Sequence, residues 1–502
     1  MLTGLLASRV ERIGVTRLPA EVVAKAKLCV LDVIGCGLAG AAHPAVGALR
    51  AAVDPRPAAR GNPGASVWGT RLRAGASTAA LLNGTMSHVV NADDAHKESM
   101  GHPGTVVVPA ALAVGEMLGA PGGALLEAVI AGYECLLRIG LGIGIASHRD
   151  RGWYSTSTLG PFGAAAAAAK LLGLDAGGVA GALGHAGAQA AGLWAFSADG
   201  SLGSVVSAGR AAESGVLAAL LVRSGFAGPT QILEAADGGF LRAMSDESDP
   251  EPILADRGGR FMIMDVSLKP YPSSRTTHAA IDACLAIRAR LAGRPGWLER
   301  LSQVTIHTYA VAKRQADIAA PTTGWMASLS LPYTTAVALL EGAVGLEHFA
   351  PRYLESAAIR ALMNKVSVVV DEGLSAAFPG KWSCRVEVTG ADGTRESEWI
   401  ESARGDPRNP MSAAEVRQKF HALTEGVLGR ATGERICAYV DRLEQERDVA
   451  ELAALLRPPR SAGPRRAVPA PRSSRRAGAG FAAGARGRRD RQARPAGAGE
   501  LG

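Results

Sequence analysis

The chain has 502 residues, of which 47% are hydrophobic and 20% charged, and its formal net charge is +8. The positive charge is concentrated in residues 457–502, which hold twelve arginines and two acidic residues, so residues 1–456 have a net charge of −2. A near-neutral body argues against a folded nucleic-acid-binding surface, because such a surface needs clustered cations. We expect residues 457–502 to form a disordered tail, since Arg, Ala, Gly, Pro and Ser make up almost all of it.

Cysteine usage and hydropathy indicate a cytoplasmic protein. The six cysteines, at positions 29, 36, 135, 284, 384 and 437, form no CxxC pair. This spacing gives no support to a structural zinc site or an iron–sulfur cluster, and scattered thiols are typical of the reducing cytosol. The N-terminal residues lack the pattern of a secretory signal, and no apolar stretch is long and uninterrupted enough to predict a membrane span.

The first half of the chain has the spacing of apolar residues that is typical of buried helices. We predict a helical domain over residues 1–265, to which residues 405–456 return. Its helices are predicted at 21–38, 109–118, 125–137, 160–172, 179–191 and 208–222. Glycines at 35, 37 and 40, and again at 140, 142 and 144, are expected to end two of them.

The pattern changes after residue 265. Alternating or β-branched residues predict strands at 303–309, 365–370, 384–388 and 394–400, with a turn at 390–393 and helices at about 276–292 and 334–342. We therefore predict an α+β domain over residues 266–404. Ser412 is a candidate N-cap for the helices that follow. The fold class is a mainly α protein with an α+β second domain.

A polar cluster at 91–103 contains Asp93, Asp94, His96 and His102. Acid–base chemistry needs titratable groups that converge from a loop held by a rigid scaffold, and this loop lies between two apolar helices. Composition alone favours a solvated loop in which Asp94 caps a helix.

A second cluster, at 269–278, combines two prolines with Lys269, Ser274 and Arg275. The prolines stiffen the backbone and the cations suit carboxylates, but an interdomain linker with ordinary surface charge fits equally well. Tyr333 is a third candidate, although a tyrosine at the start of a helix more often packs in a core. Seven isolated histidines are assigned structural roles, at positions 43, 88, 148, 185, 307, 348 and 421. The sequence contains no GxxxxGK[ST], HExxH or GxSxG motif and no strand-linked GxGxxG.

Read in chain order, these segments resemble the MmgE/PrpD family, which includes 2-methylcitrate dehydratase and cis-aconitate decarboxylase. The matching segments are residues 32–40, 83–96, 102–104, 160–175, 209–215, 225–229, 269–272, 278–283 and 330–333. The resemblance implies a large helical domain that takes in the C-terminal helices, a smaller α+β lid domain and a homodimer. It also implies a small polycarboxylate substrate and no metal, iron–sulfur cluster or other cofactor.

By the same resemblance, Asp93, His102, Lys269 and Tyr333 are the expected catalytic residues. His102 would be the general base or acid, and Asp93 would orient it or share its proton. Tyr333 would protonate or bind the leaving oxygen, while Lys269 and Arg275 would hold carboxylates. The expected substrate-binding residues are Asp94, His96, Tyr154, Ser204, Arg210, Ser274 and Arg275.

The sequence departs from the family at several of these positions. Tyr154 stands where many members have His, and Ser204 and Ser207 stand where members often have Lys and His. Ser274 occupies a position that is His in the decarboxylase and often Cys elsewhere, and Ala95 replaces a frequent Thr. The segment from His96 to His102 is also about two residues longer than in the decarboxylase. These departures argue against a faithful methylcitrate dehydratase or aconitate decarboxylase, and we expect either a substrate with fewer charges or a changed reaction.

The leading hypothesis is a cofactor-independent hydro-lyase that dehydrates a small hydroxy-(poly)carboxylate by taking a proton next to a carboxylate. The alternatives are an isomerase or epimerase, a decarboxylase of a related dicarboxylate, and a catalytically weak homologue that acts as a binding protein. The expected partners are a small carboxylate and a second copy of the chain. We expect no membrane contact and no nucleic acid, for which only the basic tail argues.

Overall fold

The computed structural model describes residues 1–55 and 64–458, which belong to one compact unit. Two large hydrophobic cores lie within it. The first gathers buried residues between Leu6 and Leu268 and between Val416 and Leu456. The second gathers buried residues between Ala279 and Ala403. The predicted tail lies outside the described residues from 459 on, whereas Arg457 is placed and donates a hydrogen bond to Ser66 Oγ at 3.0 Å.

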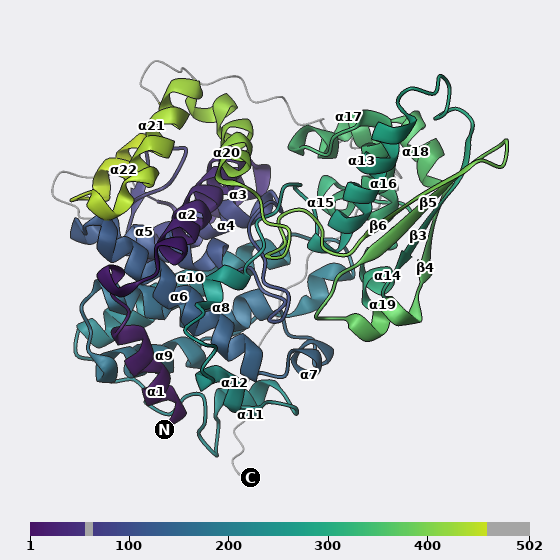
Figure 1. Ribbon diagram of the computed structural model, residues 1–502. Coiled ribbons are helices and arrows are strands. Elements are labelled where there is room, and N and C mark those ends of the chain that lie inside the picture. The colour runs from purple at the N-terminus through teal and green to yellow at the C-terminus, as the bar shows by residue number, and fades with distance from the viewer. Residues whose placement is uncertain (56–63, 459–502) are drawn as a thin grey trace, which may run out of the picture. The chain divides into compact units, whose positions relative to one another are not determined.

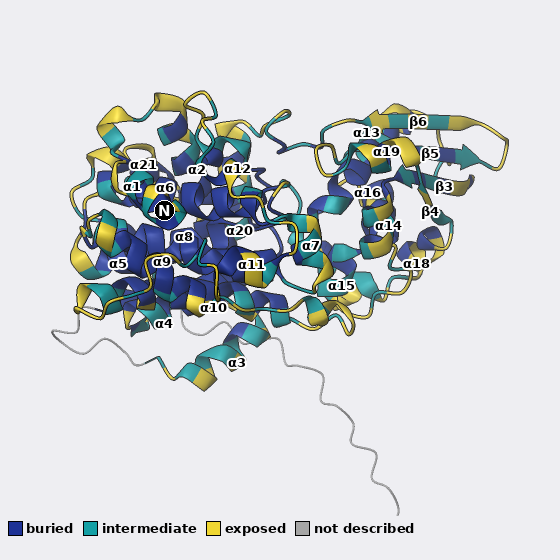
Figure 2. Ribbon diagram, turned by 90° about the horizontal axis from the view of Figure 1, so that it is seen from below, coloured by how far each residue is buried: buried dark blue, intermediate teal, exposed yellow. Residues whose placement is uncertain are grey.

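The first core is built from helices (Figures 1 and 2). α8 lies at its centre and packs against α5, α6, α9 and α10, and it is buried from Ser155 to Ala169. The helices before residue 265 are α1 (Leu2–Glu11), α2 (Ala20–Gly40), α3 (Pro44–Val53), α4 (Ala76–Val89), α5 (Gly104–Leu118), α6 (Gly122–Gly142), α7 (Ile145–Asp150), α8 (Ser155–Leu171), α9 (Ala176–Ala188), α10 (Gly203–Arg223), α11 (Phe240–Met244) and α12 (Glu251–Leu254). A short hairpin, β1 (Ala65–Ser66) and β2 (Arg73–Ala74), stands between α3 and α4.

The expectation that glycines end two of these helices is confirmed for Gly40 and Gly142, which are the last residues of α2 and α6. Gly35, Gly37 and Gly140, in contrast, lie inside the two helices. A Cβ atom on Gly40 would lie 2.1 Å from the Met86 carbonyl oxygen of α4, and one on Gly142 would lie 2.4 Å from Ile253 Cγ1. These glycines are therefore places where neighbouring elements approach closely, and tertiary packing offsets their low helix propensity.

Several helices begin three to five residues earlier than the sequence predicts, and in two of them a proline becomes internal. α5 starts at Gly104 and α8 at Ser155, so that Pro109 and Pro161 lie inside them. Proline removes one backbone donor from a helix. Both helices are almost wholly buried, and we attribute their continuity to the packing of the surrounding turns.

The C-terminal helices return to the first core, next to α2 (Figure 1). They are α20 (Ala413–Leu428), α21 (Arg430–Asp441) and α22 (Ala450–Leu455). The predicted N-cap is confirmed, because Ser412 Oγ accepts from Glu415 N and the Glu415 carboxylate accepts from Ser412 N. Lys419 of α20 reaches into the core and donates to Asp32 Oδ1 of α2 at 2.6 Å.

The second core lies between helices and a four-stranded mixed sheet with the order β4-β3-β5-β6. β3 (Leu301–Thr308) is parallel to β4 (Val366–Val370) and antiparallel to β5 (Cys384–Gly390), which pairs antiparallel with β6 (Arg395–Ile400). Val304 and Ile306 of β3 are buried in this core, as the alternation predicted. Its helices are α13 (His278–Leu291), α14 (Ala310–Ala316), α15 (Gly324–Leu329), α16 (Leu331–Glu341), α17 (Pro351–Leu354), α18 (Ala357–Met363) and α19 (Glu372–Ala377). The predicted fold class is thus confirmed.

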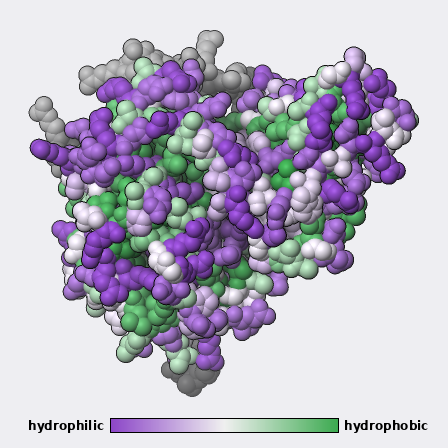
Figure 3. Space-filling model, in the orientation of Figure 1, coloured by the Kyte–Doolittle hydropathy of each residue, from purple (hydrophilic) through white to green (hydrophobic). Residues whose placement is uncertain are grey.

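One helix in the described part of the chain, α10, is long and apolar enough to cross a membrane, and 56% of the apolar window is buried inside the protein. It packs against α4, α8 and α9, as a core helix does. Figure 3 shows hydrophilic residues along the outer edge of the α+β part and hydrophobic patches interrupted by polar residues over the helical part.

Candidate active site

The loop between α4 and α5 carries the candidate site. Two of its non-glycine residues, Asn91 (φ +51°) and Met100 (φ +47°), have the left-handed conformation, which recurs at functional sites where surrounding contacts hold it. Lys269 Nζ donates to the Asn91 carbonyl oxygen at 3.1 Å and to Asn91 Oδ1 at 2.8 Å. Asn91 Nδ2 donates to Ser328 Oγ at 2.9 Å. These bonds tie the loop to the segment before α13 and to α15.

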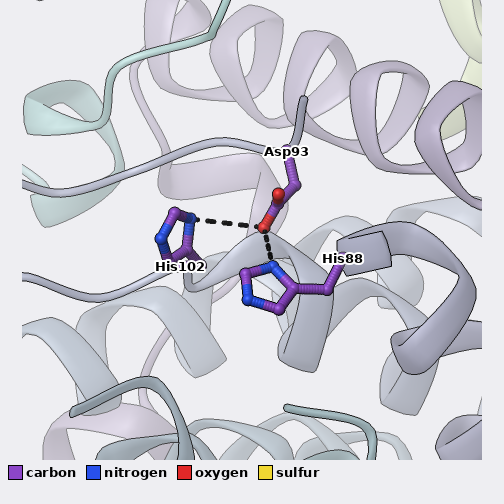
Figure 4. A group of neighbouring side chains, drawn as sticks. All are labelled: His88, Asp93 and His102. Carbon is purple, nitrogen blue, oxygen red and sulfur yellow. Dashed lines mark hydrogen bonds and ion pairs between the residues drawn. The ribbon is translucent and has the colours of Figure 1, made fainter. Parts of the chain in front are cut away.

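Asp93 lies between two imidazoles (Figure 4). Its Oδ2 atom is 2.8 Å from His88 Nδ1 and 3.3 Å from His102 Nδ1. His88 extends from the last turn of α4, and the two ring centroids are 4.8 Å apart. The structure therefore brings together the two predicted residues Asp93 and His102. It adds His88, for which the sequence predicts only a structural role.

Hydrogen-bond partners decide which ring nitrogens carry protons. His102 Nδ1 faces two acceptors, Asp93 Oδ2 and the Asp94 carbonyl oxygen at 2.8 Å, so this nitrogen is the donor. A neutral His102 then has its lone pair on Nε2, on the far side of the ring from Asp93 (Figure 4). His88 Nδ1 donates to Asp93 in the same way, and its Nε2 accepts from the Tyr154 hydroxyl at 2.8 Å.

The charges of the cluster follow from burial and from neighbouring ions. Burial alone would raise the pKa of Asp93, but His88, His102 and Lys269 outweigh it and hold this pKa well below its usual range. Burial lowers the pKa of His102, and the Asp93 carboxylate partly offsets this. Burial also lowers the pKa of Lys269, whose Nζ lies 3.9 Å from Asp93 Oδ1. The arrangement is an ionised carboxylate beside an imidazole that favours its neutral form.

Asp94 accepts two hydrogen bonds that hold the loop in place. Its Oδ2 accepts from the Tyr133 hydroxyl at 2.6 Å and its Oδ1 from Gly104 N at 2.9 Å. Burial raises the pKa of Asp94 to about 7. This predicted substrate-binding residue is fully buried and does not line the cavity described next. It anchors the turn that enters α5.

A cavity of about 420 Å³ opens in front of His102. Its walls come from both the helical and the α+β part of the chain. Six predicted residues line it: His96, His102, Tyr154, Ser204, Ser274 and Arg275. His102 has 20% of its side chain exposed, which gives a ligand in the cavity access to this ring.

Three other predicted residues lie elsewhere. Lys269 is fully buried and its Nζ is occupied by Asn91, so it acts as a counter-ion behind Asp93. Arg210 is 61% exposed on α10, where it pairs with Glu213. Tyr333 borders a separate cavity of about 730 Å³, and its hydroxyl donates to the His348 carbonyl oxygen at 2.5 Å. The structure therefore does not bring Tyr333 or Arg210 to His102.

Several residues of this cavity were not predicted from the sequence. They are His88, Arg149, Trp194, Phe196, Arg314 and Trp325. A signal existed for His88, which stands five residues before Asp93 at the end of an apolar helix. The aromatic residues and the two arginines come from separate segments, and no spacing in the sequence connects them.

His88, Asp93 and His102 could also hold a metal ion, because one ligand atom from each lies within 4.8 Å of the others. The two Nδ1 atoms would then have to exchange their protons for the ion. Imidazole and carboxylate are common ligands of zinc and of redox metals, so the donor set by itself fits such an ion.

Comparison with known proteins places this site in a family. The MmgE/PrpD N-terminal domain matches residues 4–253, and the MmgE/PrpD C-terminal domain matches residues 271–445. The cis-aconitate decarboxylase-like protein oryM of Aspergillus oryzae is 29% identical over 476 residues, 91% of this chain and 97% of the relative. The cis-aconitate decarboxylase of Aspergillus terreus is 27% identical (88% and 93% covered), and that of Mus musculus 26% identical (91% and 94% covered). Since the two domain matches together cover most of its length, the chain belongs to the MmgE/PrpD family.

Proposed function

We propose that this protein is a lyase of a small carboxylic acid in which His102 Nε2 takes the proton from the carbon next to a carboxylate. The observation that carries the proposal is the pair of acceptors at His102 Nδ1, which leaves Nε2 as the basic nitrogen beside the cavity. An imidazole within reach of a substrate proton is the commonest general base in enzymes.

Asp93 and Lys269 complete the proton transfer. When His102 Nε2 accepts a proton, the ring becomes a cation, and the ionised Asp93 stabilises that cation at Nδ1. Lys269 balances the Asp93 charge while the ring is neutral. Tyr154 fixes the tautomer of His88, which in turn holds Asp93 in place.

Dehydration of a hydroxy acid is the reaction that follows most directly from a neutral His102. The C–H bond breaks, its electron pair forms the double bond, and the C–O bond breaks with loss of hydroxide, which a proton converts to water. Decarboxylation is the second candidate, and the names of the relatives favour it. In that reaction a C–C bond breaks, carbon dioxide leaves, and a protonated His102 returns a proton to the carbon.

Turnover in deuterated water tests the proposal. The protein is incubated with malate, citrate, 2-methylcitrate and cis-aconitate, and products are followed by NMR and mass spectrometry. We expect deuterium exchange and loss of water from at least one hydroxy acid. Release of carbon dioxide from cis-aconitate would instead establish decarboxylation, and deuterium exchange without loss of water or carbon dioxide would indicate an isomerase or epimerase. If neither these acids nor a hydroxy acid with an apolar substituent, such as 2-benzylmalate, shows exchange or turnover, the enzyme proposal is wrong.

The variant His102→Gln assigns the step to this residue. General-base catalysis contributes about 10²–10⁴-fold, so we expect kcat to fall by at least about 100-fold with the fold retained. His185→Gln is the matched control, because His185 is a half-buried histidine of α9 outside the cavity and should leave kcat unchanged. Equal activity of the two variants would remove His102 from the mechanism.

A further inference from the structure

The positively charged residues that line the cavity differ in whether they have a hydrogen-bond or ion-pair partner. Lys97 Nζ donates to Asp406 Oδ2 at 2.7 Å, and Arg275, which donates to two carbonyl oxygens, has Asp406 at 3.9 Å. In contrast, the guanidinium groups of Arg149 and Arg314 have no hydrogen-bond or ion-pair partner within residues 1–55 and 64–458. Arg149 is half-buried on α7, so its unpaired charge needs an anion more than an exposed arginine would.

These two arginines come from opposite sides of the cavity. Arg149 belongs to the helical part and Arg314 to α14 of the α+β part, and both line the cavity. Burial, and then the nearby charge of Arg314, lower the pKa of Arg149. Two like charges that line one cavity are stabilised by an anion bound to both, and guanidinium groups match the planar geometry of a carboxylate.

Aromatic rings separate this pair from His102. The Arg149 guanidinium stacks on Trp194 at 4.2 Å from the ring centroid. Trp194 in turn contacts Phe196 and Tyr154, with ring centroids 5.0 and 5.3 Å away. The Tyr154 hydroxyl is hydrogen-bonded to His88, which contacts Asp93. On the α+β side, the Trp325 ring centroid lies 6.3 Å from that of His88. Planar aromatic rings from the helical part and from the α+β part therefore line the cavity together with the arginines and His102.

Two small uncharged residues, Ser204 and Ser274, also line the cavity, and the Ser204 hydroxyl has no hydrogen-bond partner among the residues that the structure describes. A further carboxylate placed against these serines and the aromatic rings would lose its hydration without gaining an opposite charge, which is unfavourable.

We propose that Arg149 and Arg314 bind a carboxylate of the substrate, and that the substrate carries an apolar, preferably planar, segment between this carboxylate and the carbon that reacts at His102. The substrate class is an amphipathic organic acid and not a compact tricarboxylate. This inference rests on the proposed function for the position of the reacting carbon, whereas the arginine pair and the aromatic walls are independent of it.

Binding of three unreactive acids to the full-length protein tests the inference by calorimetry. Succinate carries two carboxylates, benzylsuccinate adds an aromatic ring, and tricarballylate adds a third carboxylate. We expect benzylsuccinate to bind at least tenfold more tightly than succinate, and tricarballylate to bind no more tightly than succinate. A tighter complex with tricarballylate than with benzylsuccinate would overturn the proposal.

Variants assign the binding to the residues named. Arg314→Gln should weaken benzylsuccinate at least tenfold, and it is the safest variant because Arg314 is exposed and has no described partner. Arg149→Gln should have the same effect, whereas Arg151→Gln, which changes an arginine outside the cavity that pairs with Asp246, should have none. Trp325→Leu should lower the preference for benzylsuccinate and leave succinate binding unchanged.

Unchanged benzylsuccinate binding in both Arg149→Gln and Arg314→Gln would overturn the anion site. The result is separable from the proposed function, because these acids are bound and not converted. Loss of turnover in His102→Gln, together with unchanged benzylsuccinate binding in the two arginine variants, would support the proposed reaction and not the anion site. Intact turnover in His102→Gln with loss of binding in Arg314→Gln supports the anion site alone.

Discussion

At the scale of single residues, the neutral form of His102 determines how activity depends on pH. Burial lowers the pKa of this imidazole, so its basic form is present at neutral pH and is lost as pH falls. Because free histidine has a pKa of about 6.5, we expect kcat/KM to be level near pH 7–8 and to fall in acid with a midpoint below about 6.5. A profile that rises toward acid would mean that protonated His102 is the active form, as decarboxylation requires.

The variant Asp93→Asn tests whether the acidic midpoint of the kcat/KM profile belongs to His102. The Asp93 carboxylate raises the pKa of His102, so its removal should move the acidic midpoint to lower pH as well as lower kcat. Asp246→Asn changes an exposed carboxylate outside the cavity and should leave the profile in place. An identical midpoint in all three proteins would assign the titration to another group.

Sequence reasoning identified some residues of the candidate site and missed others. Asp93 and His102 stand nine residues apart in one polar loop, but the family resemblance, and not the composition of the loop, predicted them as catalytic residues. Tyr333 could not be excluded, since its sequence context does not reveal that its hydroxyl is bound to the His348 carbonyl oxygen. Arg149 and Arg314 could not be singled out, because each stands beside other charged residues, Asp150 or Lys313, and nothing in the sequence distinguishes it from them.

At the scale of elements, close contact between α4 and α10 sets the position of His88 relative to Ser204. A Cβ atom on Gly209 would lie 2.2 Å from Thr85 Oγ1 and 2.4 Å from the Leu81 carbonyl oxygen. Gly209→Ala must therefore push the two helices apart. Overpacking of this kind costs about 1–3 kcal/mol, and we expect a loss of that size in the free energy of unfolding by urea, together with reduced kcat.

Gly426→Ala is the matched control for this prediction. Gly426 lies in α20, is exposed, and has no atom within 4 Å of the position of an added Cβ. Alanine should stabilise this helix by about 0.5–1 kcal/mol. If Gly209→Ala were as stable as Gly426→Ala, the contact between α4 and α10 would not be the constraint that we infer.

At the scale of the whole molecule, buried neutral histidines predict loss of stability in acid. Burial lowers the pKa of His96 and of His148 to about 4. The unfolded chain binds protons at these positions below about pH 6.5, and the folded chain does not, so stability is retained above pH 6.5 and falls between pH 6.5 and 4. Each group contributes a loss on the order of 3 kcal/mol by pH 4.

Thermal unfolding at pH 7, 5.5 and 4.5 measures this loss, and His148→Gln tests its source. The variant should lose less stability than the native chain over the same interval, whatever its stability at pH 7. Equal losses would show that other groups control the acid transition. The homodimer implied by the family resemblance stays a prediction for light scattering at the same pH values.

The sequence by itself determined the classes of structure and the chemical groups available. Apolar periodicity and β-branched alternation placed most of the longer helices, although not α4, and all four strands of the main sheet, because local spacing decides which face of an element is buried. Tertiary structure alone decided which groups meet. His88 and His102, Arg149 and Arg314, and Trp194 and Trp325 come together because helices and loops far apart in the chain pack at contacts that local spacing does not encode. That packing gave Asp93 its two imidazoles, placed Tyr333 beside another cavity, and left Arg149 and Arg314 without an ion-pair partner among the described residues.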